Sequence, residues 1–177
     1  MDRALLEQQL AQLPIAQYEF FSPQELEFSD RIRRVCELEC PRYGKTWACP
    51  PAVGSVEACK SRCLSYSGGL LISTLTEVTD IGDMEACLAA RGPHEALTHE
   101  VIALLRQQGL EVYGLSTESC GLCEQCAYPQ APCHKPEKML PCVESQGIVV
   151  TALAEKYEIA YQYGGNIVTW FSLLLYR

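Results

Sequence analysis

Apolar residues recur at helical spacing in several stretches of the chain. The stretch from Leu5 to Leu13 has this spacing and is followed by Pro14, so it predicts a helix that ends before the proline. The segment from Ser55 to Tyr66 predicts another helix, with Ser55 as its N-terminal cap. Three more helices are predicted at residues 83–90, 93–108 and 147–157.

Short apolar runs between these helices predict strands at residues 68–78, 110–117 and 167–176. We expect the last strand to pair with residues 159–163 in a hairpin that turns at Gly164 and Gly165. Alternating strands and helices predict an α/β fold, in the form of an α+β sandwich. We therefore expect a small mixed sheet with helices, cysteine-rich metal-binding loops and a C-terminal hairpin.

The length of 177 residues, 48% of them hydrophobic, predicts one domain with a core of ordinary size. Within this single metal-binding domain we distinguish a variable N-terminal helix and strand segment and two cysteine motifs, at residues 1–30, 31–66 and 118–146. The first residues do not resemble a signal peptide, and no apolar run approaches the roughly 20 residues of a membrane span. We therefore expect a cytoplasmic protein without a membrane partner.

Eleven cysteines are present, an odd number that cannot pair off completely in disulfides. In a reducing cytosol, clustered thiols are more often metal ligands or redox groups than structural disulfides. Cys87 lies in an apolar helical stretch and is expected to be a buried small hydrophobe. The same explanation suits Cys59 and Cys63 as well as metal ligation does, but it suits the cysteines at positions 120, 123 and 126 badly.

Four cysteines lie between residues 120 and 133. Cys120, Cys123 and Cys126 have the CxxCxxC spacing, and Cys133 follows Pro132. Bacterial ferredoxins hold [4Fe–4S] clusters with the same three-cysteine run and a more distant cysteine next to proline, although their proline follows that cysteine. This motif predicts a [4Fe–4S] cluster, and a structural zinc ion is the alternative.

A second set is formed by Cys36, Cys40 and Cys49, followed by Pro50 and Pro51. We expect a second cluster here, which Tyr43 and Trp47 could shield from water. The fourth ligand is open: Cys59, Cys63 and Cys142 are candidates, or one iron is left free for a substrate. Cys63 is preferred, because a helix that begins at Ser55 carries it one turn beyond Cys59 toward the following strand.

Basic residues are concentrated around this second set. Residues 31–62 contain seven Lys or Arg and three Glu, a local charge of +4 in a chain of −8, which leaves −12 elsewhere. Cations stabilise thiolate-ligated clusters, although a solvated basic face explains the same count. The acidic remainder argues against nucleic acid as a partner.

Two stretches, YGKTWACPP (residues 43–51) and the cysteine-rich stretch of residues 120–150, resemble the signature blocks of domain-of-unknown-function family 2284, predicted metal-binding proteins common in anaerobes. The aromatic C-terminal segment and the PxKxxP element at Pro136, Lys138 and Pro141 are also similar to that family. The resemblance implies metal binding through the cysteines at positions 36, 40, 49, 120, 123, 126 and 133. Cys142 stands where relatives usually have serine.

These observations favour an iron–sulfur protein with one or two clusters, which acts in electron transfer or as an accessory to a redox or metalloenzyme partner in anaerobic metabolism. The alternative is an enzyme in which Cys36, Cys40 and Cys49 hold a cluster with an open iron that binds substrate. A zinc-stabilised interaction module is the second alternative.

Overall fold

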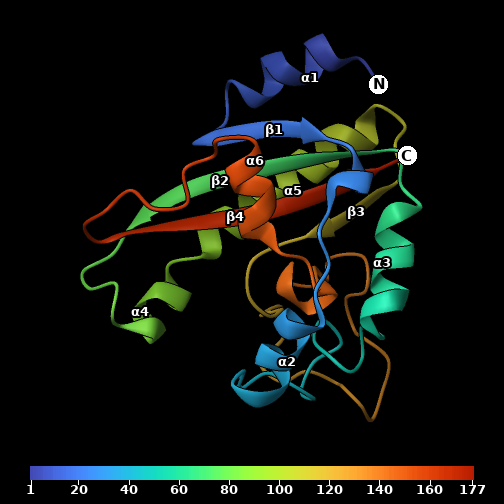
Figure 1. Ribbon diagram of the computed structural model, residues 1–177, viewed down its shortest axis with the longest axis vertical. Coiled ribbons are helices and arrows are strands. Elements are labelled where there is room, and N and C mark those ends of the chain that lie inside the picture. Colours follow the sequence, from blue (N-terminus) through green and yellow to red (C-terminus); the bar gives the residue numbers. More distant parts are fainter.

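The two most apolar runs of the sequence form the centre of a four-stranded sheet, in a computed structural model that describes residues 1–177 (Figure 1). Strand β2 (Gly68–Glu77) pairs with β4 (Ile167–Tyr176) along its whole length. Strand β1 (Gln17–Phe21) pairs with the outer edge of β2, and β3 (Val112–Leu115) with the outer edge of β4. The strand order is therefore β1-β2-β4-β3.

Helices cover both faces of this sheet, because successive side chains of a strand point to opposite faces. On one face, Leu70, Ile72 and Leu174 pack with residues of α1 (Arg3–Leu10) and α5 (Gly92–Gln107). On the other face, Leu71 and Leu173 pack with residues of α3 (Val56–Leu64) and α6 (Val150–Lys156). The mixed α/β class predicted from the sequence is confirmed.

Two details of that prediction are wrong. The sheet is not mixed, because all three strand pairs are antiparallel. The C-terminal hairpin does not form, because residues 159–163 lie outside the strands and β4 pairs with β2 and β3 instead. Residues 170–175 of β4 are all buried, so both faces of this strand must be covered, as they are in the centre of the sheet and would not be in an isolated hairpin.

The helices agree more closely with the sequence. Ser55 caps α3 by accepting a hydrogen bond from the amide of Ala58, and α4 (Met84–Ala89) begins after Asp83 as expected. Helix α2 (Asp30–Leu38) was not predicted, because its sequence is mostly charged. It begins after Ser29, whose side chain accepts a hydrogen bond from the amide of Arg31. Two single-turn helices, η1 (Pro23–Glu25) and η2 (Glu144–Gln146), complete the structure.

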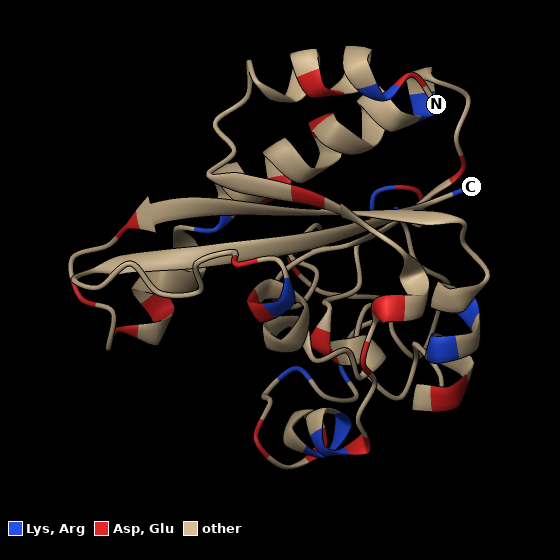
Figure 2. Cartoon of the chain, turned by 45° about the horizontal axis from the view of Figure 1, so that its top comes forward, with Lys and Arg blue, Asp and Glu red and all other residues tan.

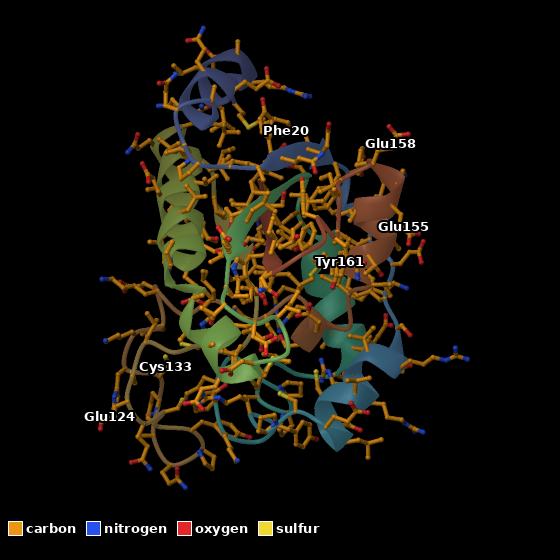
Figure 3. The ribbon with its side chains drawn as sticks, turned by 90° about the vertical axis from the view of Figure 1, so that its left-hand side faces the viewer. Phe20, Glu124, Cys133, Glu155, Glu158 and Tyr161 are labelled. Carbon is orange, nitrogen blue, oxygen red and sulfur yellow. The ribbon has the colours of Figure 1, made fainter.

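The loops that carry most of the cysteines lie together on one side of the sheet. Figure 2 shows α2, with its basic residues, at the end of the molecule opposite α1. In Figure 3, Glu124 and Cys133 lie on the loop at this same end, far from Phe20 of β1. None of the helices is both long and apolar enough to cross a bilayer.

A buried polar network joins α5 to the sheet. The His94 Nδ1 atom lies 2.8 Å from the Thr74 hydroxyl, and Nε2 lies 2.8 Å from the Ser172 hydroxyl. Thr98 donates to the His94 carbonyl at 2.8 Å and lies 2.9 Å from the Ser172 hydroxyl. Burial lowers the pKa of His94 to about 4, so the imidazole is neutral in the folded protein.

We expect this histidine to make folding sensitive to mild acid. In the unfolded chain the pKa of this imidazole is near 6.5. Between about pH 6.5 and 4 the imidazole is therefore protonated in the unfolded state and neutral in the folded state. Stability from this group is complete above pH 6.5 and declines as pH falls, by about 3 kcal/mol at pH 4. Urea unfolding of the protein and of His94→Gln across this range measures the difference. An identical pH dependence in both would contradict the prediction.

Candidate metal centres

The four cysteines of the CxxCxxC region line one small cavity. Cys120, Cys123, Cys126 and Cys133 are all partly buried, and the loop of residues 119–141 that carries them contains no helix or strand. The cavity has a volume of about 20 Å³, which is close to the space of one water molecule. We call these four residues the downstream set.

Trp47 anchors this loop to the rest of the protein. Its Nε1 donates to the Ala131 carbonyl at 3.0 Å, and its ring meets Tyr128 edge to face at 4.9 Å. Lys135 also donates to the Leu122 carbonyl at 2.8 Å. Trp47 also lines the cavity of the downstream set. Tyr43 instead lines a separate cavity with Cys36, Cys40 and Cys49.

Cys36, Cys40 and Cys49 line a second cavity, of about 170 Å³. The fourth cysteine on this cavity is Cys142. We call these four residues the upstream set; the cavity is completed by Val35, Tyr43, Pro50, Glu118, Ser119 and Glu144. Within neither set are three metal-binding side chains already close enough together to hold a single ion.

The position of Cys142 depends on contacts between segments distant in the sequence. Ser116 lies just after β3; its amide donates to the Pro141 carbonyl at 2.9 Å, and the Val143 amide donates back to the Ser116 carbonyl at 3.0 Å. This bridge holds Cys142 beside the end of the strand. No sequence pattern indicates such a contact, because the bridge depends on how residues 119–141 return to the sheet.

Cys63, the fourth ligand preferred from the sequence, does not lie on this cavity. It is fully buried in the core beside residues such as Leu71, and burial raises its pKa to about 12. The helix does carry Cys63 toward the sheet, but this direction leads into the core and away from the other thiols. Cys59 is also buried, and its thiol donates to the Val53 carbonyl at 3.4 Å.

At two places in the chain, adjacent residues line different cavities. Ala48 lines the downstream cavity and Cys49 the upstream one; likewise Ser119 lines the upstream cavity and Cys120 the downstream one. Adjacent Cα atoms are about 3.8 Å apart. The Cys49 thiol donates to the Ser119 hydroxyl at 3.3 Å, which ties the two connecting segments together.

Burial favours the protonated form of two thiols in the upstream set. It raises the pKa of Cys36 to about 11 and that of Cys142 well above the ordinary value for a thiol. Metal must therefore displace protons, which makes binding tighter at higher pH. The nearby guanidinium of Arg33 favours the Cys36 thiolate; it is buried and donates to the carbonyls of Gly54 at 2.7 Å and Ser145 at 2.6 Å.

A second cation lies beside the downstream set. Arg91 donates to the Ser119 carbonyl at 2.6 Å. Its other terminal nitrogen would lie only 2.6 Å from a Cβ atom at position 121, so a side chain there would displace the end of this arginine. Both sets therefore combine four thiols with a neighbouring guanidinium, which is an environment suited to an anionic metal centre.

Comparison with known proteins gives one match. The model of a family described as predicted metal-binding protein, DUF2284, matches residues 19–176. No curated protein and no solved structure is significantly similar to the chain.

Proposed function

The chain belongs to the DUF2284 family of predicted metal-binding proteins, and from this premise we propose that it is an iron–sulfur protein of electron transfer. In this proposal the downstream set, Cys120, Cys123, Cys126 and Cys133, holds one [4Fe–4S] cluster. The upstream set, Cys36, Cys40, Cys49 and Cys142, holds a second. Such clusters supply a reduction potential that the surrounding charges, hydrogen bonds and solvent exposure adjust.

The observation that carries this proposal is the proximity of the two cavities. Each is lined by four cysteines, and the segments that connect them pass from one cavity to the other between adjacent residues. Two centres lined by residues adjacent in the sequence would suit the passage of electrons through the protein. We propose a redox or metalloenzyme partner in anaerobic metabolism, and a cytoplasmic location, where thiols stay reduced.

Cavity size favours an iron–sulfur cluster over zinc in the upstream set, and cysteine spacing favours one in the downstream set. The CxxCxxC run has ferredoxin spacing. The upstream cysteines surround a cavity of about 170 Å³, which is larger than the space that a single metal ion needs. Zinc bonds each sulfur at about 2.3 Å, so the upstream thiols would have to close around it. The downstream cavity is narrow, and its loop of residues 119–141 must open to admit a cluster.

The protein contributes charge and shielding from water in this proposal. Arg33 stabilises thiolate charge in the upstream set, and Arg91 has the same role in the downstream set. Trp47, held by its hydrogen bond to Ala131, covers the downstream set.

An enzymatic upstream centre is supported less well. That alternative assumed three cysteine ligands and an open iron, but Cys142 is a fourth thiol on the same cavity. Electron transfer or an accessory role is therefore the better proposal for this centre.

Metal analysis of anaerobically purified protein tests the proposal. We expect about eight iron and eight sulfide per chain, with little zinc. Stoichiometric zinc without acid-labile sulfide would replace the iron–sulfur proposal with the zinc-stabilised interaction module.

A further inference from the structure

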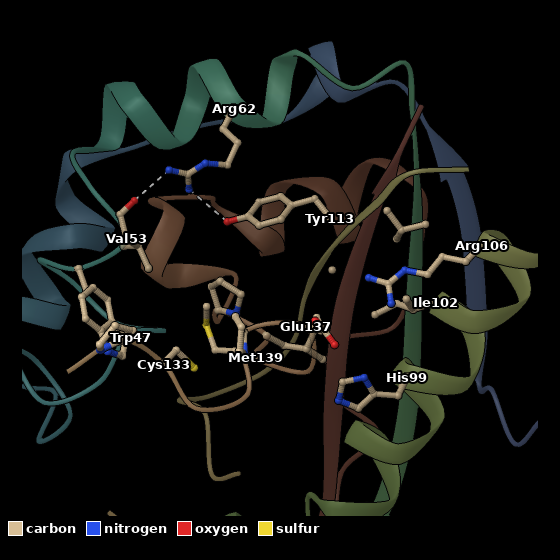
Figure 4. Close-up of a pocket in the computed structure, with 17 residues that line it drawn as sticks. Trp47, Val53, Arg62, His99, Ile102, Arg106, Tyr113, Cys133, Glu137 and Met139 are labelled. Carbon is tan, nitrogen blue, oxygen red and sulfur yellow. Dashed lines mark hydrogen bonds between the residues drawn. The ribbon is translucent and has the colours of Figure 1, made fainter. Parts of the chain in front are cut away.

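A third cavity is larger than either of the two cysteine-lined sites. It is a cleft of about 520 Å³, which is within the usual range for small-molecule sites (Figure 4). Its walls come from α3, β3, the second half of α5 and residues 132–141 of the downstream loop. Cys133, Trp47 and Met139 line both this cleft and the downstream cavity, so a molecule bound here would lie against the metal-binding loop.

The charged side chains of the cleft favour an anion. Arg62 of α3 and Arg106 of α5 face the cleft from different walls, and Glu137 is the one carboxylate that lines it. Neither arginine forms an ion pair within the chain. Burial lowers the pKa of His99, which also lines the cleft, so this residue adds polarity but no charge at neutral pH.

The two arginines differ in what already binds them. Arg62 donates to the Tyr113 hydroxyl at 3.2 Å and to the Val53 carbonyl at 3.3 Å, so its guanidinium is fixed in place. Arg106 has no side-chain hydrogen bond to the other residues that line the cleft and projects into it. Arg106 is therefore free to bind a ligand in the bidentate manner typical of arginine and carboxylate groups.

The remaining lining is mostly apolar and includes Ile102, Val112, Met139 and Leu140. We propose that the cleft binds a small organic carboxylate with an apolar body of about ring size, whose carboxylate group is held by Arg106. The apolar wall takes the body of the ligand, and the fixed charge of Arg62 adds to the local positive potential. Binding at this site does not depend on which metal the neighbouring loop holds.

The experiment uses 2-naphthoate as the probe and its uncharged analogue 2-naphthamide as the comparison, by equilibrium dialysis with the full metal-loaded chain. We expect the acid to bind at least tenfold more tightly than the amide. Arg106→Gln should weaken binding of the acid at least tenfold, because it removes a charge-assisted hydrogen bond, and should change binding of the amide little. Iron and zinc are measured in the same samples, so a wrong assignment of the metal does not obscure the result.

Two further variants separate local recognition from general charge. Glu137→Gln should tighten binding of 2-naphthoate, since it removes the one opposing carboxylate of the cleft. Lys60→Gln removes a cation from the exposed side of α3, outside the cleft, and should leave binding unchanged. Equal affinity for the acid and the amide, unaltered binding in Arg106→Gln, or an equal loss in Lys60→Gln would each overturn the proposal.

Discussion

Replacing Cys123 with serine is expected to remove the metal of the downstream set and to lower the melting temperature by about 10 °C. Residues 119–141 have no helix or strand and few anchoring side chains such as Trp47, so we expect metal ligation to contribute much of the order of this loop. A metal present at a thousand times its dissociation constant stabilises a protein by about 4 kcal/mol. For a domain of this size, each kcal/mol shifts the melting temperature by about 2–4 °C.

Differential scanning calorimetry and metal analysis of the same samples measure this effect. The matched control is Cys87→Ser, which alters a buried cysteine of α4 that lines neither cysteine cavity. That variant should keep its full metal content. A Cys123→Ser protein with wild-type metal content and melting temperature would show that Cys123 is not a ligand.

The upstream set leads to the second large effect. Iron should fall from about eight to about four per chain in Cys49→Ala. Cys142→Ala should alter the upstream centre, because it removes the fourth thiol of the cavity, and electron paramagnetic resonance should show a three-iron signal. Cys63→Ala should leave iron content and spectrum unchanged, since Cys63 packs in the core.

The three variants discriminate between the possible fourth ligands. A three-iron signal in Cys63→Ala, with an unchanged spectrum in Cys142→Ala, would restore the ligand preferred from the sequence. An unchanged spectrum in both would return the upstream centre to an open iron that can bind substrate. Iron of about four in the wild type, unaffected by Cys49→Ala, would leave a single cluster and a structural role for Cys49.

Local patterns in the sequence predicted most of the helices and the grouping of the downstream cysteines. Residues three apart in a loop stay close in space, so the spacing of Cys120, Cys123 and Cys126 was enough to group them, and the structure gives them a common cavity with Cys133. The same holds for α3, whose cap and apolar positions lie within one segment. Such features depend on neighbours along the chain and need no knowledge of the fold.

Features that depend on distant segments could not be predicted in this way. The partners of β4 are set by the order of the whole sheet, and the apolar run of residues 167–176 is equally compatible with a hairpin. The fourth upstream cysteine is brought into place by the bridge between Ser116 and Cys142. Helical position alone pointed to Cys63, but the face of a helix that meets the core cannot also face a metal in a loop.

The contact between Cys49 and the Ser119 hydroxyl has a consequence for how the metal centres assemble. Cys49 and Ser119 line the upstream cavity, and their chain neighbours Ala48 and Cys120 line the downstream cavity, so the first metal to bind also orders backbone next to the second site. Fixing the backbone of one residue costs about 1–2 kcal/mol, and the second metal is spared part of this cost at the adjacent residues that are already ordered. Loading should therefore be cooperative, with half-loaded chains scarce during reconstitution.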